Sequence, residues 1–149
     1  MKMNAITLFT IGFTGKSAET FFKTLKQAGI IRVIDIRLNN VSQLAGFSKR
    51  DNLMYFLREI CACGYQHQPL LAPTKEILGD YKQKRIDWTA YERQFNDLLK
   101  IRKAHTLLSP SDLDMACLLC SEPTADKCHR RLVAEYFQNN LDGIKIHHL

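Results

Sequence analysis

The stretch MACLLCSEPTADKCHRRLVAEYFQNN, residues 115–140, joins a short apolar run to an amphipathic segment. The apolar run, residues 115–119, predicts a strand at the centre of a sheet. Residues 126–140 carry the apolar spacing of a helix, and Thr124 or Asp126 is placed to cap its amino-terminal end. A buried strand followed directly by a helix is the repeating unit of parallel α/β proteins.

The same alternation of apolar runs and amphipathic segments extends over the rest of the chain. Strands are expected at residues 6–11, 30–36, 65–71 and 144–148, and helices at 17–29, 48–63 and 88–101. The alternation predicts a single α/β domain over residues 1–149, with an open, mostly parallel sheet and helices on both faces. Residues 72–87 are the least regular segment, which favours a solvated connection over a basic lid above a site.

Composition restricts the class of protein. The 149 residues are 46% hydrophobic and 24% charged, which suits one ordinary core and excludes collagen-like and disordered chains. No apolar run approaches the roughly 20 residues that cross a bilayer, so we expect no membrane partner. Five cysteines are an odd count, which suits reduced thiols better than a secreted disulfide framework. With no recognisable secretion signal, the chain is expected to be cytoplasmic.

The net charge of +6 favours anionic partners, either a small anionic molecule or nucleic acid. The segment Gly15-Lys16-Ser17 looks like the end of a nucleotide-binding phosphate loop. That loop requires a glycine at position 10, where this chain has Thr10, so the match fails. The turn around Gly12 and Thr14, just before a predicted helix, still suits a single anion.

Polar and thiol groups stand at the ends of two predicted strands. Asp35 and Arg37 are two residues apart, as are Cys120 and Glu122, so each pair shares a face. Ligands of open parallel sheets bind outside the carboxyl ends of the strands. We therefore expect these four side chains to meet in one crevice, together with Cys128 and Arg130 from the following helix.

The cysteines of the 115–140 stretch suggest thiol chemistry more than a metal site. Cys128 is expected in the first helical turn beside two cationic side chains, which lower a thiol pKa, so it should be more reactive than Cys120 provided it is exposed. Cys117 and Cys120 have the spacing of a metal pair, but on a strand their thiols diverge. Cys120, Glu122, Cys128 and His129 offer zinc ligands in principle, yet neighbours on a helix rarely aim at one ion. The sequence therefore predicts no metal site and names no cofactor.

Taken together, the motifs resemble the bacterial family called domain of unknown function 488. They are Thr10-Ile11-Gly12, Asp35-Ile36-Arg37, Cys120-Ser121-Glu122 and Cys128-His129-Arg130, and the resemblance spans residues 6–148. The family label supplies no reaction, so the function rests on the predicted site.

The first hypothesis for that site is an enzyme that acts on a phosphorylated or nucleic-acid substrate. Its expected catalytic residues are Asp35, Cys120, Glu122 and Cys128, and its expected anion-binding residues are Gly12, Thr14, Arg37, His129 and Arg130. The alternatives are a non-catalytic anion- or nucleic-acid-binding module, and a thiol redox or metal-binding protein. Carboxylates paired with arginines favour catalysis.

Overall fold

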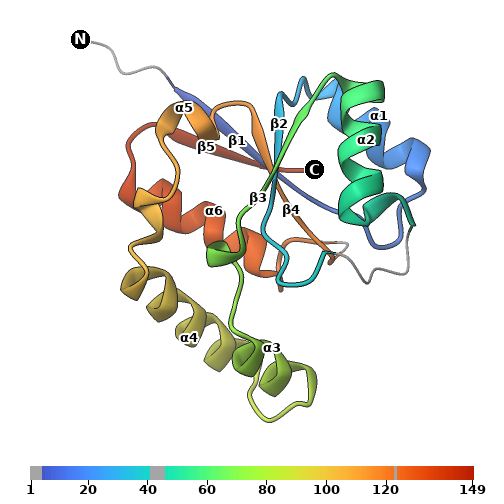
Figure 1. Cartoon of the computed structure of the whole chain (residues 1–149). Coiled ribbons are helices and arrows are strands. Elements are labelled where there is room, and N and C mark those ends of the chain that lie inside the picture. The colour runs from blue at the N-terminus through green and yellow to red at the C-terminus, as the bar shows by residue number, and fades with distance from the viewer. Residues whose placement is uncertain (1–4, 41–45, 123) are drawn as a thin grey trace.

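Five parallel strands form an open sheet with helices on both faces, as Figure 1 shows. The computed structural model describes residues 5–40, 46–122 and 124–149. The strands are β1 (Ile6–Gly12), β2 (Arg32–Asp35), β3 (Gly64–His67), β4 (Ala116–Cys120) and β5 (Ile144–His148). The helices are α1 (Ala18–Gln27), α2 (Arg50–Cys61), α3 (Lys75–Lys82), α4 (Trp88–Ile101), α5 (Pro110–Leu113) and α6 (His129–Asn140). The predicted fold class is confirmed. In the described part of the chain, no helix is long and apolar enough to cross a membrane.

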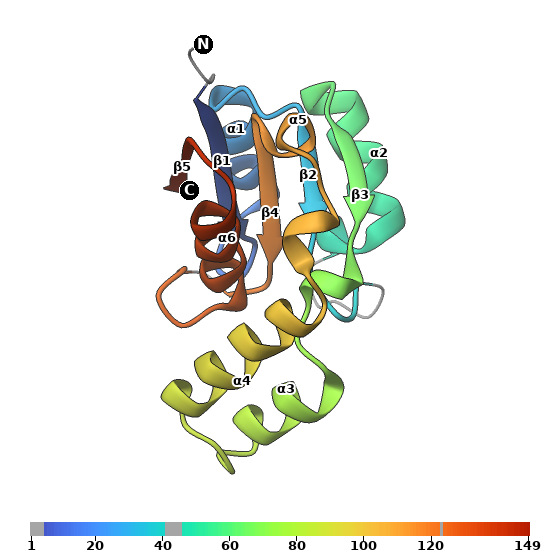
Figure 2. The same ribbon diagram turned by 90° about the vertical axis from the view of Figure 1, so that its left-hand side faces the viewer.

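The strand order is β3-β2-β4-β1-β5, so the last motif-bearing strand lies between the first two. The register pairs Gly12 of β1 with Cys120 of β4, and Asp35 of β2 with Leu119 of β4. All five residues of β4 are buried, as expected for a central strand of a parallel sheet. The order therefore brings the ends of β1, β2 and β4 to one edge of the sheet, at the bottom of Figure 2.

Side chains of the strands alternate between two cores, one on each face of the sheet. Cys117 and Leu119 pack in the core that contains the apolar side chains of α1 and α2. Leu118 and Cys120 pack in the core formed with α4, α5 and α6. Cys117 and Cys120 therefore point to opposite faces, as the sequence predicts.

Residues 72–87 are more regular than the sequence suggests. They contain α3, which Thr74 caps by accepting a hydrogen bond from the backbone N–H of Ile77. None of the residues of α3 is fully buried, and it is held through contacts such as that of Tyr81 with Trp88, whose ring centroids are 5.8 Å apart. Helices α3 and α4 lie beyond the carboxyl ends of the strands in Figure 2. The segment is therefore not the irregular connection that the sequence suggested, because contacts with α4 stabilise a helix whose own apolar pattern is weak.

Helix α6 begins at His129, three residues later than expected from the sequence. Cys128 is its N-cap residue and has an extended backbone with φ of −138°. Its sulfur accepts a hydrogen bond from the backbone N–H of Arg130 at 3.5 Å. The two capping residues expected from the sequence bond to each other instead, since the Thr124 hydroxyl donates to Asp126 at 2.6 Å.

Gly12 ends β1 where the chain after β4 passes very close. A Cβ at this position would lie 1.6 Å from the carbonyl oxygen of Glu122 and 2.6 Å from Nη1 of Arg130. Because backbone must move to relieve such a clash, Gly12→Ala should lower the free energy of unfolding by about 3 kcal/mol, measured by urea denaturation. The matched control is Gly79→Ala in α3, where a Cβ meets nothing within 4 Å. That variant should gain about 0.5–1 kcal/mol, and equal effects of the two changes would contradict the described approach of the two loops.

Candidate functional site

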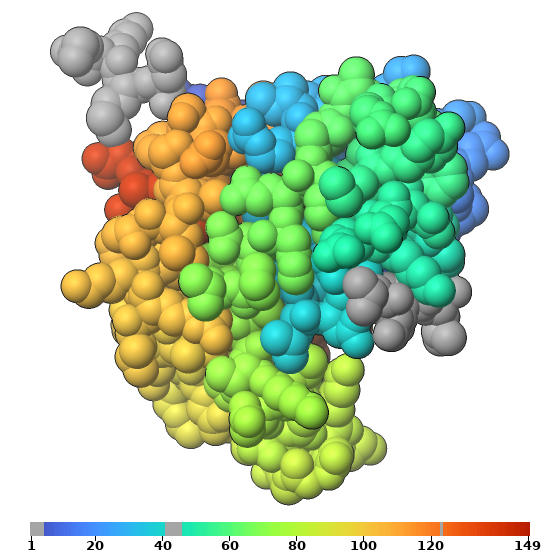
Figure 3. Space-filling view, in the orientation of Figure 1, coloured from blue at the N-terminus to red at the C-terminus, as the bar shows by residue number. Residues whose placement is uncertain are grey.

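A cavity of about 350 Å³ lies between the carboxyl edge of the sheet and the helices α3 and α4. Its walls come from the segment after β2, the segment after β4, the start of α6, and α3 with α4. The space-filling view shows the segment after β2 (cyan) beside the α3 region (yellow-green) at the surface (Figure 3). Four of the six residues expected in one crevice line this cavity, namely Arg37, Cys120, Glu122 and Cys128, and His129 lines it as well. Asp35 and Arg130 do not line it.

A second, wider groove of about 530 Å³ lies between α1 and α2. Its walls are mainly apolar and include Phe22, Phe56 and Ile60. It contains none of the residues that the sequence singled out, and it lies on the α1–α2 side of the sheet, opposite the core that contains Cys120 and Cys128. The smaller cavity at the strand ends is therefore the candidate site.

Arg37 is held rigidly at the wall of the cavity. Its Nε donates to Oδ1 of Asp35 at 2.8 Å and its Nη2 donates to Oδ2 at 2.7 Å. The guanidinium also lies over the ring of Phe13, with 5.4 Å between Cζ and the ring centroid. The side chain is only 3% exposed, and its Nη1 has no hydrogen-bond partner among the described residues. A buried guanidinium with one free, oriented donor is suited to an anion.

Asp35 holds Arg37 in place, and both of its carboxylate oxygens accept hydrogen bonds from buried partners. Besides the fork of Arg37, it accepts a hydrogen bond from the hydroxyl of Tyr65 at 2.5 Å. Burial and this bond raise the pKa of Tyr65, which keeps the phenol a donor. Since Asp35 pairs with Leu119 in the register, it lies on the face of α1 and α2, away from the face of Cys120. Asp35 therefore holds Arg37 in place, and the expected convergence of its carboxylate with Glu122 in one crevice is not found.

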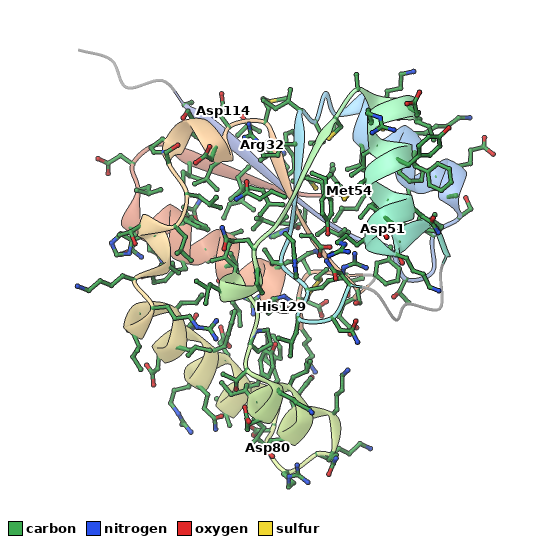
Figure 4. The ribbon with its side chains drawn as sticks, in the orientation of Figure 1. Arg32, Asp51, Met54, Asp80, Asp114 and His129 are labelled. Atoms are coloured by element: carbon green, nitrogen blue, oxygen red, sulfur yellow. A yellow bond between two sulfur atoms is a disulfide. The ribbon has the colours of Figure 1, made fainter. Side chains whose placement is uncertain are left out.

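Two histidines fix the backbone that carries Arg37. Nε2 of His129 donates to the carbonyl of Ile36 at 2.8 Å, and Nε2 of His67 donates to the carbonyl of Arg37 at 2.9 Å. Burial lowers the pKa of His129 to about 4, so the ring is neutral at pH 7. With its proton on Nε2, the ring carries a free lone pair on Nδ1. Figure 4 shows His129 near the α3–α4 end of the sheet, far from Arg32 and Asp114.

Arg130 binds the protein itself instead of lining the cavity. It is 1% exposed, and its Nε donates to the hydroxyl of Thr10 at 3.2 Å. Its Nη1 donates to the sulfur of Cys120 at 3.4 Å and to the carbonyl of Glu122 at 2.5 Å. These bonds join β1, β4 and α6, and they occupy the guanidinium that the sequence suggested as an anion ligand.

The turn after β1 is likewise used for packing. The backbone N–H of Thr14 donates to the carbonyl of Ser121 at 3.0 Å, while Gly12 admits the chain near Glu122. Neither Gly12 nor Thr14 lines the cavity. The anion-binding role expected for this turn therefore has no geometric support at the candidate site.

The two thiols of the late motif meet at the cavity wall. The sulfurs of Cys120 and Cys128 are joined as a disulfide, and these residues are 1% and 2% exposed. The greater reactivity expected for Cys128 depended on exposure, and that condition is not met. Elsewhere, burial raises the pKa of Cys63 to about 11 and also raises that of Cys117, so neither thiol is activated.

The aromatic wall of the cavity was missed by sequence analysis. Tyr81, Trp88 and Tyr91 line it from α3 and α4, with ring centroids of Trp88 and Tyr91 5.0 Å apart in a stacked pair. Lys82 and Lys127 add two exposed cationic side chains. The sequence does contain a signal for this wall, because these aromatic residues lie in or next to the basic segment 72–87. The hypothesis of a basic lid considered only the charge of that segment.

The sequence of the chain matches a known family of proteins. The model of the family described as domain of unknown function DUF488 matches residues 17–137. The chain belongs to this family. The resemblance inferred from the sequence motifs is thus confirmed, and the DUF488 match includes every residue that lines the cavity. No curated protein and no solved structure matches the chain.

The buried pair of Asp35 and Arg37 should dominate the stability of this region. Asp35→Asn leaves the guanidinium without its counter-charge, so the free energy of unfolding should fall by about 3 kcal/mol in urea denaturation. Replacing both partners, as in Asp35→Asn with Arg37→Met, should recover part of that loss. Glu19→Gln is the matched control, because the Glu19–Lys23 pair has the same kind of contact, at 2.6 Å, but is exposed. A control loss as large as that of Asp35→Asn would show that burial is not the deciding factor.

Proposed function

We propose that the chain is an enzyme that acts on a small phosphate-bearing molecule in the strand-end cavity. The observation that carries this proposal is that Arg37 lines the cavity while its buried Nη1 finds no hydrogen-bond partner among the residues that the structure describes. Buried donors are almost always paired, and a phosphate oxygen is a strong, charged acceptor for a guanidinium. Lys82 and Lys127 at the rim add long-range attraction for the same charge.

The aromatic wall supports a substrate that combines the phosphate with a planar ring. Trp88 and Tyr91 are stacked at an interplanar angle of 21°, and Tyr81 lies 5.0 Å from Tyr91 between ring centroids. Such faces bind a base or another flat ring. A volume of about 350 Å³ is at the small end of ligand pockets, which favours a molecule of nucleotide size over a nucleic-acid duplex.

Glu122 is the acid–base group best placed for chemistry in the cavity. It is exposed and lines the cavity, and its charge contributes to the raised pKa of Tyr91 after burial and Tyr81. Unlike Asp35, its carboxylate is not occupied by a buried arginine. Cys120 and Cys128 form the adjoining wall, and their pairing makes thiol redox chemistry the second candidate function.

Ligand binding can be followed through Trp88, the only tryptophan of the chain, because it lines the cavity. Titration with adenosine monophosphate should change its fluorescence, with an affinity at least about tenfold above that for adenosine, a difference of about 1.4 kcal/mol. Lys127→Ala should weaken the nucleotide affinity about threefold, whereas Lys100→Ala, an exposed lysine of α4 that does not line the cavity, should not. Equal affinities for adenosine monophosphate and adenosine would contradict the proposal that the cavity binds the phosphate.

Catalysis is tested by turnover of a panel of phosphate esters, with products followed by phosphorus NMR. Glu122→Gln should lower kcat by a factor of about 100 or more while the Trp88 titration stays unchanged, since general acid–base groups contribute that much. Glu135→Gln, a half-exposed carboxylate of α6 outside the cavity, is the control and should retain full turnover. Tight binding without turnover of any ester would assign the chain to the non-catalytic binding modules.

A further inference from the structure

We propose that, once the bond between Cys120 and Cys128 is reduced, these two residues and His129 bind one zinc ion whose fourth position opens into the cavity. One donor atom from each of these residues lies within 4.8 Å of the other two. Zinc is bound at about 2.3 Å from sulfur and about 2.0 Å from nitrogen, so donors on one tetrahedral ion are roughly 3.5 to 4 Å apart. After reduction, the two sulfurs have to separate to this spacing, and the third donor is already within reach of the same ion. Two thiolates and an imidazole are also ligands that zinc favours.

The positions of the two cysteine backbones suit a shared ion. Their Cα atoms are 7.8 Å apart. Disulfides usually join Cα atoms within about 6.8 Å, and larger separations require the backbone to move. An ion placed between the sulfurs adds two metal–sulfur bonds to the span and accommodates the larger separation.

Each ligand is supported by a further hydrogen bond. His129 donates from Nε2 to the carbonyl of Ile36 at 2.8 Å, which fixes the ring and leaves Nδ1 as the nitrogen available to a metal. The sulfur of Cys120 accepts from Nη1 of Arg130 at 3.4 Å, and that of Cys128 accepts from the backbone N–H of Arg130 at 3.5 Å. Donors of this kind stabilise thiolates, and the carbonyl bond of a histidine is the usual support of a metal ligand.

The structure removes the reason for which the sequence predicted no metal. The side chains of adjacent residues within a helix point in different directions, so they rarely bind one ion. Cys128, however, is the N-cap residue with an extended backbone, and only His129 is helical. Cys117 takes no part, because it points into the other core.

The fourth coordination position of the zinc ion would face the cavity. All three ligands line it, and no fourth histidine, cysteine or carboxylate among the described residues joins the cluster. Three protein ligands with an open position are typical of catalytic zinc, whereas structural zinc has four. The site would thus place a Lewis acid in the same cavity as Arg37, going beyond the proposed phosphate site.

The experiment uses the full chain, reduced with a phosphine, loaded with zinc or cobalt and desalted. Elemental analysis should find about one metal per chain, and the cobalt form should show thiolate charge-transfer absorption. Cys120→Ser, Cys128→Ser and His129→Gln should each weaken zinc binding at least about 100-fold in a competition assay with a chelating dye. Cys61→Ser, a free and half-buried thiol on α2, is the matched control and should retain one zinc per chain.

Three results would overturn the proposal. The first is a reduced chain that keeps no stoichiometric metal, and the second is a cobalt form without thiolate absorption. A mass deficit of two hydrogens between Cys120 and Cys128 that persists in excess zinc would assign the pair to redox chemistry instead. If the variants fail to fold, the wild-type cobalt spectrum and a zinc-dependent rise in Tm decide the matter. The Trp88 titration, made on metal-free protein, separately reports on the proposed phosphate site.

Discussion

The buried guanidinium of Arg130 is the constraint on which the end of the sheet depends. It reaches from α6 to Thr10 of β1, to the sulfur of Cys120 on β4 and to the carbonyl of Glu122. Burial lowers its pKa, so this cation is stable only while its donors are satisfied by these acceptors. Three elements that are far apart in the sequence must therefore meet at one point, and Gly12 is required there because a side chain would fill the space.

The buried guanidinium of Arg37 differs from that of Arg130, because not all of its nitrogens are bonded to residues that the structure describes. Arg37 is tied to Asp35 through two of its nitrogens, and the third has no hydrogen-bond partner in the described part of the chain. Arg130 thus holds the elements together, whereas Arg37 lines the cavity with a donor. Asp35 acts through Arg37, because a carboxylate with so many donors has no free capacity for a substrate proton.

The cavity combines groups from both halves of the chain. The donor of Arg37 comes from the segment after β2, the thiols and His129 come from the end of β4 and the start of α6, and the aromatic wall comes from α3 and α4. Helix α1 follows β1 on one face and α6 follows β4 on the other, so the chain leaves these neighbouring strands in opposite directions. Openings at such points are the usual ligand sites of parallel sheets.

By itself, the sequence determined the alternation of strands and helices, the parallel sheet and the divergence of Cys117 and Cys120, because local apolar periodicity encodes an element and its faces. It also singled out Arg37, Cys120, Glu122, Cys128 and His129, which line the cavity. Only the tertiary structure decided that β4 lies between β1 and β2, and that Asp35 pairs with Leu119 and so lies on the face opposite Cys120. It also decided that Cys128 caps α6 and that α3 forms a cavity wall. Strand order and short helices depend on contacts between distant residues, and no local pattern contains that information.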